Sequence, residues 1–136
     1  MTRLTALWKR GQPRAGDGPV HVSMNDYWIH RFRDVPRVAL EGLRLRRHWA
    51  ELEGALGLWM ASFRRGRRQV SISIWRSPGD LQRFVRSPEH LRIMREFKDA
   101  GALHTNAWTA ERFDRDLIWR QATDRLTGRI PGVRHH

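Results

Sequence analysis

The segment from residue 69 to residue 113 constrains the fold more than any other part of this chain. It begins with an alternation of apolar and small polar residues, QVSISIW, which is typical of a strand that ends at Trp75. Two Ser-Pro pairs follow, Ser77-Pro78 and Ser87-Pro88. Each pair predicts a helix start, because serine caps a helix and proline is tolerated at its first position. A second strand is predicted over residues 104–113, so the segment has the order strand, helix, helix, strand.

The preceding part of the chain supplies a matching half. A strand is expected from Val20 to about residue 32, and an apolar stripe at three- and four-residue spacing predicts a helix over about residues 35–53. A second strand is expected over residues 57–64, and the RRGRR run that follows predicts a glycine-centred hairpin. The full order is βαββαβ. It predicts an α+β, ferredoxin-like fold with a four-stranded antiparallel sheet and the helices on one face.

The ends of the chain extend beyond this unit. With 136 residues the chain is expected to form one domain. Glycine and proline make residues 1–18 typical of a flexible arm. Residues 19–113 then form the ferredoxin-like domain, and residues 114–136 a short C-terminal helix followed by a tail.

Charge and composition narrow the classes of function. The formal net charge is +12, and Lys9 and Lys98 are the only lysines among 26 basic residues. Such a charge is typical of nucleic-acid binders. The arginines are nevertheless spread along the chain apart from residues 64–68, and a GC-rich coding sequence gives the same bias, so we do not expect nucleic acid as the partner. Arginine also clamps carboxylates and phosphates, which favours an acidic small molecule equally well.

Several classes of function have no support in the composition. There is no cysteine, which excludes a disulfide framework, a thiol nucleophile and a cysteine metal site. The sequence has no apolar run near the roughly 18 residues of a membrane helix and no export signal, so we expect a cytoplasmic protein without membrane contact. No spacing of His, Asp and Glu predicts a metal site.

The two faces of the predicted sheet differ in chemistry. Valine, isoleucine and methionine occupy the even-numbered positions of the first and third strands, and we expect this set to face the helices. Small polar groups and aromatic rings would then lie on an open face. Two copies packed through such faces would form a barrel around a cavity, which predicts a homodimer with a small-molecule pocket. Alternatively, the aromatic rings only make dimer contacts.

The run SISIWRSPGDLQRFVRSPEHLRIM resembles the pattern of the dimeric α+β barrel superfamily, which includes antibiotic-biosynthesis-type monooxygenases and small haem-degrading monooxygenases. The resemblance covers about residues 19–113. It implies a ferredoxin-like homodimer that acts on a small aromatic or polyketide-like metabolite with O₂ and without an organic cofactor. The superfamily also holds cyclases, isomerases and dehydratases, so its reaction is less specific than its fold.

Haem is the alternative cofactor that the resemblance raises. Haem-degrading members use an asparagine on the first strand, a tryptophan in the helix after the third strand, and a histidine later in that helix. Asn25 matches the asparagine, but Phe84 stands at the tryptophan position and Met94 near the histidine position. The resemblance therefore does not imply haem degradation. A haem protein of this fold, with a histidine as axial ligand, stays open as a second hypothesis.

His90 is the main candidate for a catalytic base. It lies three positions into a predicted helix, where the helix dipole disfavours the imidazolium ion. A neutral imidazole there would accept a proton from a phenol or enol, or bind haem iron; the alternative is a histidine that only stabilises the helix start. His21 is the second candidate base, and Asn25 and Asn106 are candidates for stabilising an oxyanion. The expected substrate-binding residues are Trp59, Phe63, Trp75, Phe84, Asn106 and Trp108.

A third hypothesis is a non-catalytic module that binds a ligand, or binds nucleic acid through the arginine hairpin at residues 64–68.

Overall fold

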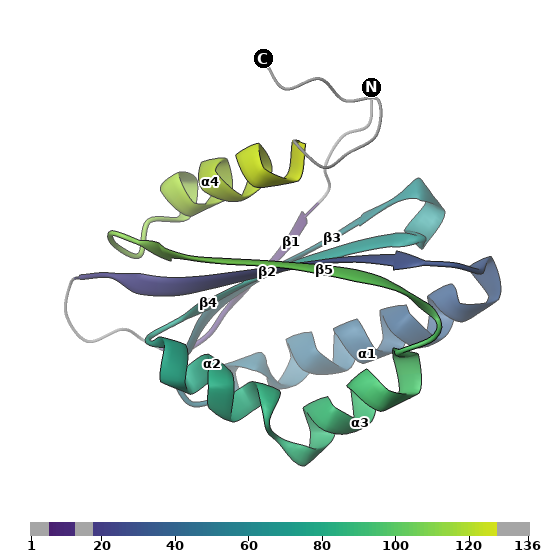
Figure 1. Cartoon of the computed structure of the whole chain (residues 1–136). Helices are drawn as coiled ribbons and strands as arrows, with labels where there is room; N and C mark the ends of the chain where they lie inside the picture. Colours follow the sequence, from purple (N-terminus) through teal and green to yellow (C-terminus); the bar gives the residue numbers. More distant parts are fainter. Residues whose placement is uncertain (1–5, 13–17, 128–136) are drawn as a thin grey trace.

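The computed structural model describes residues 6–12 and 18–127 as a twisted sheet with helices on both faces (Figure 1). The sheet is antiparallel and has the strand order β1-β3-β4-β2-β5. Helices α1, α2 and α3 lie below the sheet in Figure 1, and α4 lies above it. The strands are β1 (Ala6–Arg10), β2 (Val20–Ile29), β3 (Ala55–Phe63), β4 (Arg68–Trp75) and β5 (Gly101–Ala110). The helices are α1 (Val35–His48), α2 (Pro78–Val85), α3 (Pro88–Phe97) and α4 (Arg115–Thr127).

The ferredoxin-like order predicted from the sequence is confirmed. Strands β2, β3, β4 and β5 with helices α1 to α3 form the βαββαβ unit, and β2 and β4 are its central strands. Both predicted serine caps are present. The Ser77 hydroxyl accepts a hydrogen bond from the Asp80 amide at 3.3 Å, and the Ser87 hydroxyl accepts one from the His90 amide at 3.3 Å.

The sheet contains one strand more than expected. Residues 6–10, which the sequence placed in a flexible arm, form β1 and pair antiparallel with β3. Trp8 lies opposite Trp59 in this pair, and the centroids of their rings are 4.4 Å apart. This aromatic contact holds β1 on the sheet. The rest of the expected arm, residues 1–5 and 13–17, lies outside the described residues, as does the tail from residue 128.

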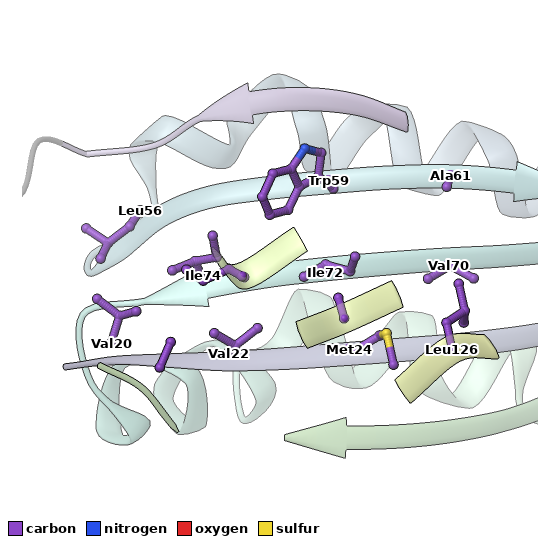
Figure 2. Close-up of a cluster of buried hydrophobic side chains, with 13 residues drawn as sticks. Val20, Val22, Met24, Leu56, Trp59, Ala61, Val70, Ile72, Ile74 and Leu126 are labelled. Carbon is purple, nitrogen blue, oxygen red and sulfur yellow. The ribbon is translucent and has the colours of Figure 1, made fainter. Parts of the chain in front are cut away.

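The apolar face of the sheet packs against α4, which corrects the expectation that it would face the other helices. The even-numbered apolar residues of β2 and β4 form one buried cluster with Ile118, Ala122 and Leu126 of α4 (Figure 2). These three positions are spaced by four, so they form one face of the helix. The Trp119 ring lies 5.2 Å from Trp59, and the Trp108 indole donates to Gln121 at 2.9 Å. The sheet residues of this cluster are Val20, Val22, Met24, Leu56, Trp59, Ala61, Val70, Ile72, Ile74 and Ala110.

An ion pair is buried on the same face. The Arg68 guanidinium donates to both carboxylate oxygens of Asp26, at 2.9 and 2.6 Å. The side chains are 1% and 3% exposed. The guanidinium carbon also lies 4.8 Å from the centre of the Trp28 ring and 5.4 Å from that of Phe63. Two charges here are tolerated because each satisfies the other.

Helices α1 to α3 cover the opposite face much less tightly. Helix α1 has no buried residue. Direct packing between this layer and the sheet is concentrated at one end, where Trp49, Leu58 and Trp75 form a second buried cluster with Ala55. The Arg92 guanidinium of α3 donates to Glu41 of α1 at 3.2 Å, which joins the two helices. A cavity therefore lies between this helical layer and the polar face of the sheet.

Candidate active site

The cavity between the sheet and helices α1 to α3 has a volume of about 2080 Å³. Because side chains alternate along a strand, the odd-numbered residues of β2 and β4 point into it. Its sheet surface is therefore polar, and its helical surface is mostly apolar. A cavity with apolar walls and a few polar groups is typical of small-molecule sites. The polar sheet residues are His21, Ser23, Asn25, Tyr27, Gln69, Ser71, Ser73 and Thr105; the apolar wall includes Val38, Leu45, Met60, Leu81, Met94 and Phe97.

Asn25 lies in the middle of the sheet surface. Its side-chain oxygen accepts a hydrogen bond from the Thr105 hydroxyl at 3.1 Å. The amide nitrogen has no hydrogen-bond partner among the described residues. Thr105 thus orients the amide so that its NH₂ group is free to donate to a bound ligand.

Tyr27 ties the sheet to the helical layer. Its hydroxyl donates to the main-chain oxygen of Phe97, the last residue of α3, at 2.7 Å. Burial, reinforced by the negative charge of Asp34, raises the pKa of Tyr27 above its ordinary value. The phenol therefore stays neutral and serves here as a donor that positions α3.

Aromatic rings line the other end of the cavity. Trp49 and Trp75 meet edge to face with centroids 5.0 Å apart, and Phe84 lies 5.4 Å from Trp75. The His90 ring lies 4.8 Å from Phe84, also edge to face. The sequence therefore places an imidazole at the end of a row of three aromatic rings, all of which line the cavity.

The backbone fixes the tautomer of His90. Its Nδ1 lies 3.2 Å from the main-chain oxygen of Val85, and a carbonyl can only accept a hydrogen bond, so Nδ1 carries the proton. The lone pair is then on Nε2. Burial lowers the pKa of His90 below its usual 6.5 and outweighs the opposing hydrogen bond to Val85. The imidazole is neutral at physiological pH, as a proton acceptor must be.

His21 is a second cavity histidine with a lowered pKa, and one of its ring nitrogens has no hydrogen-bond partner. It lies opposite Trp75 in the β2–β4 pair, and burial lowers its pKa as well. Its Nδ1 is buried without a hydrogen-bond partner, and so are the indole nitrogens of Trp49 and Trp75. Such unpartnered polar atoms are uncommon in native interiors and concentrate at sites with a function.

The unpaired charges on the lining are all positive among the described residues. Four carboxylates line the cavity, and each is in an ion pair with arginine: Glu41, Glu53, Asp80 and Glu89. Arg47, Arg95 and Lys98 also line it and form no ion pair within the described part of the chain. The cavity therefore favours a ligand with an acidic group.

The structure brings together five of the residues expected at the site. His21, Asn25, Trp75, Phe84 and His90 all line the cavity. The other four expected residues do not, because they point to the α4 face of the sheet: Trp59, Phe63, Asn106 and Trp108.

The cavity lies within one chain, between its sheet and its helices. The sequence predicted a cavity between the sheets of two copies, and that arrangement stays a prediction. Sequence reasoning missed Tyr27 and the tryptophan of the turn after α1, Trp49. The strand alternation that singled out His21 and Asn25 also marks Tyr27, whereas nothing in the periodicity distinguishes Trp49 from a core residue.

Within residues 6–12 and 18–127, no cluster of three His, Asp or Glu residues has the geometry of a metal site. In the same part of the chain, none of the helices combines the length and the apolar character that a membrane crossing needs.

Comparison with known proteins gives matches in structure alone. No family profile and no curated protein matches the sequence. SnoaB, a cofactor-independent oxygenase from Streptomyces nogalater, superposes with a TM-score of 0.55 at 15% identity, over 67% of this chain and 92% of SnoaB. The haem-degrading enzyme LmHde from Listeria monocytogenes gives 0.57 at 18% identity, over 76% of this chain and 68% of LmHde.

A third solved structure has the same fold. It is an uncharacterised ferredoxin-fold protein from Listeria monocytogenes, related to antibiotic biosynthesis monooxygenases, with a TM-score of 0.50 at 18% identity over 68% of this chain and 56% of that one. This chain shares the ferredoxin-like fold of these three proteins. At these identities the likeness concerns the fold, and the reaction must be argued from the site.

Proposed function

We propose that this chain is a monooxygenase-type oxidoreductase that oxidises an aromatic or polyketide-like metabolite with O₂ and without an organic cofactor. The observation that carries the proposal is the neutral His90, held by the Val85 carbonyl in a cavity with aromatic walls. An electron-rich aromatic substrate needs a base to ionise it, and its anion can then reduce O₂ directly. The three unpaired cations of the lining favour a substrate that is acidic.

The chemistry assigned to His90 is a proton transfer. The substrate of this step carries a CH₂ group conjugated to an aromatic ring and a carbonyl, so that its enol form is a phenol. Nε2 takes the proton of this enol, and the resulting anion supplies the electrons that form a carbon–oxygen bond between the former CH₂ carbon and O₂. The O–O bond of this peroxide then breaks. One oxygen stays on the carbon as a carbonyl and the other leaves as water with the two hydrogens of the original CH₂ group. Substrate carbon is oxidised, O₂ is reduced, and no further reductant is consumed.

The neighbouring residues have distinct roles in this proposal. The free NH₂ group of Asn25 would donate to the oxyanion that forms when the substrate loses its proton. Phe84, which packs on the buried Trp75, would hold the aromatic ring of the substrate beside His90. His21 is the alternative base, because its pKa is lowered too.

The test is oxygen consumption with a panel of acidic phenols and anthrones, followed by mass spectrometry of the product. A substrate of this enzyme gains one oxygen and loses two hydrogens. We expect His90→Ala and Asn25→Ala to reduce turnover roughly 10²-fold or more. His30→Ala, an exposed histidine away from the cavity, is the matched control. Unchanged turnover in the His90→Ala, Asn25→Ala double variant would refute the assignment, and binding without turnover would favour a non-catalytic ligand-binding module.

Haem binding in the same cavity is a second candidate, favoured by the free Nε2 of His90. With Nδ1 anchored on a carbonyl, Nε2 is the nitrogen that would bind the haem iron. Arg47, Arg95 and Lys98 would pair with the propionates. A bound haem would supply redox chemistry. The test is a titration followed by absorbance: a Soret band that saturates at one haem per chain and shifts in His90→Ala, but not in His30→Ala, would establish this candidate.

A further inference from the structure

Two arginine-rich segments that are distant in the sequence meet at one end of the sheet. Residues 30–33, which follow β2, read HRFR, and residues 64–67, which form the turn between β3 and β4, read RRGR. Figure 1 shows both at the right-hand end of the sheet. Neither segment contains an acidic residue. The fold therefore gathers arginines that are spread along the chain into one place, which we call the arginine surface.

Main-chain and side-chain contacts fix the two segments to each other. The Ile29 amide donates to the Arg67 oxygen at 2.6 Å, and the Arg67 guanidinium donates to the main-chain oxygens of Ile29 and His30 at 3.0 and 3.2 Å. Gly66 packs so closely on Val35, the first residue of α1, that a Cβ there would lie 2.7 Å from a Val35 methyl carbon. The arginine surface is therefore held in one arrangement.

Most of the positive charge on this surface is exposed and has no acidic partner. Asp34, which follows the first segment, is already paired with Arg37 at 2.8 Å. Such a surface attracts a ligand that carries several negative charges. The exposed arginines that form no ion pair within the described part of the chain are Arg31, Arg33, Arg64 and Arg65.

The backbone of the second segment has a conformation that arginine seldom adopts. Arg64 and Arg65 have φ values of +53° and +57°, in the left-handed region that favours glycine. Glycine or asparagine would form this turn more easily. Residues kept in such conformations concentrate at functional sites. The side chains of the two arginines, and not the local backbone, therefore account for their presence here.

An exposed aromatic ring accompanies these charges. Phe32 lies between Arg31 and Arg33 in the chain and is 55% exposed. The guanidinium carbon of Arg67 lies 5.1 Å from the centre of its ring. Aromatic rings and arginine planes are the surfaces on which proteins stack unpaired bases. The arginine surface thus combines groups for phosphate with a ring for a base.

We propose that the arginine surface binds single-stranded nucleic acid, with phosphates on the exposed arginines and a base on Phe32. In a duplex the bases are already stacked on each other, so the ring would have no partner. One exposed ring is also a small apolar surface for insertion into a membrane, whereas it is large enough to stack a base. Arg68, the last arginine of the hairpin run, takes no part because it is buried in its ion pair with Asp26.

The test is fluorescence anisotropy with a labelled oligo(dT) strand of about 15 nucleotides, titrated at several salt concentrations. Four phosphate contacts predict that the logarithm of the binding constant falls with the logarithm of salt concentration with a slope of about −3. The double variant Arg31→Gln, Arg33→Gln should reduce the size of this slope by roughly 1.4 and weaken binding roughly tenfold or more at about 0.1 M salt. The double variant Arg64→Gln, Arg65→Gln should have the same effect.

Two further variants separate this surface from net charge. The double variant Arg86→Gln, Arg120→Gln is the matched control, because it removes two exposed arginines from other parts of the molecule and lowers the net charge equally. We expect it to change the affinity by less than about twofold, since salt screens distant charges. Phe32→Ala should weaken binding about fivefold or more without changing the salt slope, because stacking releases no ions, and Phe32→Trp should retain the affinity.

Three results would overturn the proposal. The first is an equal loss of affinity in the control and in the arginine-surface variants, which would mean that the strand responds to net charge alone. The second is the absence of binding at protein concentrations up to about 0.1 mM. The third is binding to phosphatidylglycerol vesicles that depends on Arg31 and Arg33 while oligo(dT) binding does not, which would assign the surface to a membrane. The arginine surface lies outside the cavity, so failure of the proposed oxygenase activity would leave this result intact, and the reverse holds as well.

Discussion

Removal of the negative charge from the buried ion pair should destabilise the fold severely. In Asp26→Asn the Arg68 guanidinium stays buried, since its side chain is 1% exposed, but loses the carboxylate to which it donates two hydrogen bonds. Breaking one side of a buried pair costs about 3–5 kcal/mol. With an unfolding entropy of about 2.1 cal/mol/K per residue, a chain of this length loses roughly 3–4 °C in Tm per kcal/mol, so we expect a fall of about 10–17 °C.

The measurement is urea and thermal denaturation followed by circular dichroism. Glu111→Gln, which removes an exposed partner of Arg112, is the control and should change the free energy of unfolding by less than about 0.5 kcal/mol. The double variant Asp26→Leu, Arg68→Met removes both charges and should recover most of the loss. A loss below about 1 kcal/mol in Asp26→Asn would show that water reaches Arg68 and that this face is not closed as described.

Four further changes test other parts of the structure. Ile118→Ala leaves a void under α4 and should lower the free energy of unfolding by about 2–4 kcal/mol in urea denaturation, whereas an effect under about 1 kcal/mol would mean that α4 does not pack there. Ser77→Ala removes the cap of α2 and should cost about 1 kcal/mol by the same assay. Gly54→Ala should be destabilising by about 1–2 kcal/mol, since Gly54 has φ +78° and a Cβ there would collide with the Asp80 side chain. In an NMR titration the His90 ring should protonate with a midpoint below 6.5, and a midpoint above 6.5 would contradict the burial of the ring. Because the pKa of His90 is lower in the folded chain than in the unfolded one, its contribution to stability is complete above pH 6.5 and is lost as the pH falls below that value.

Local signals in the sequence predicted the fold well. The Ser-Pro pairs at 77 and 87 specify helix starts by themselves, and the alternation from Val70 to Ile74 specifies a strand. These features depend on neighbouring residues only, so the order of elements follows from them. Residues 6–10 were missed because a five-residue strand carries too little alternation, and its place depends on the contact of Trp8 with Trp59, about 50 residues away.

The sequence of the strands does not show which face of the sheet packs against which helices. Alternation along β2 and β4 separates Val22 from Ser23, but it does not say which element covers which side. The apolar stripe of α1 pointed to a packed interface, yet its residues line a cavity. The face of α4 that packs on the sheet includes a small residue, Ala122, so its pattern is weaker than its contribution to the core.

Only part of the candidate site was predicted, because the sequence does not show which face of the sheet borders the cavity. His90 was found because its position in the helix start could be located from Ser87. Trp59 and Trp108 were expected at the site from their aromatic character. They lie on the α4 face of the sheet instead, because they pair with Ile72 and Val22, whose side chains point to that face.

Because the cavity and the apolar core lie on opposite faces of the sheet, substitutions in the cavity can alter ligand binding while the core residues stay the same. Mutations that improve or alter a binding site commonly weaken the fold, because the same residues serve both purposes. Here the buried apolar residues that pack against α4 are at even positions of β2 and β4, and most of the cavity's sheet surface consists of their odd-numbered neighbours. A library that varies Ser23, Asn25, Ser71 and Ser73 would therefore sample new ligands while Val22, Met24 and Ile72 keep the sheet intact. Selection can act on recognition in such a scaffold with little cost in folding.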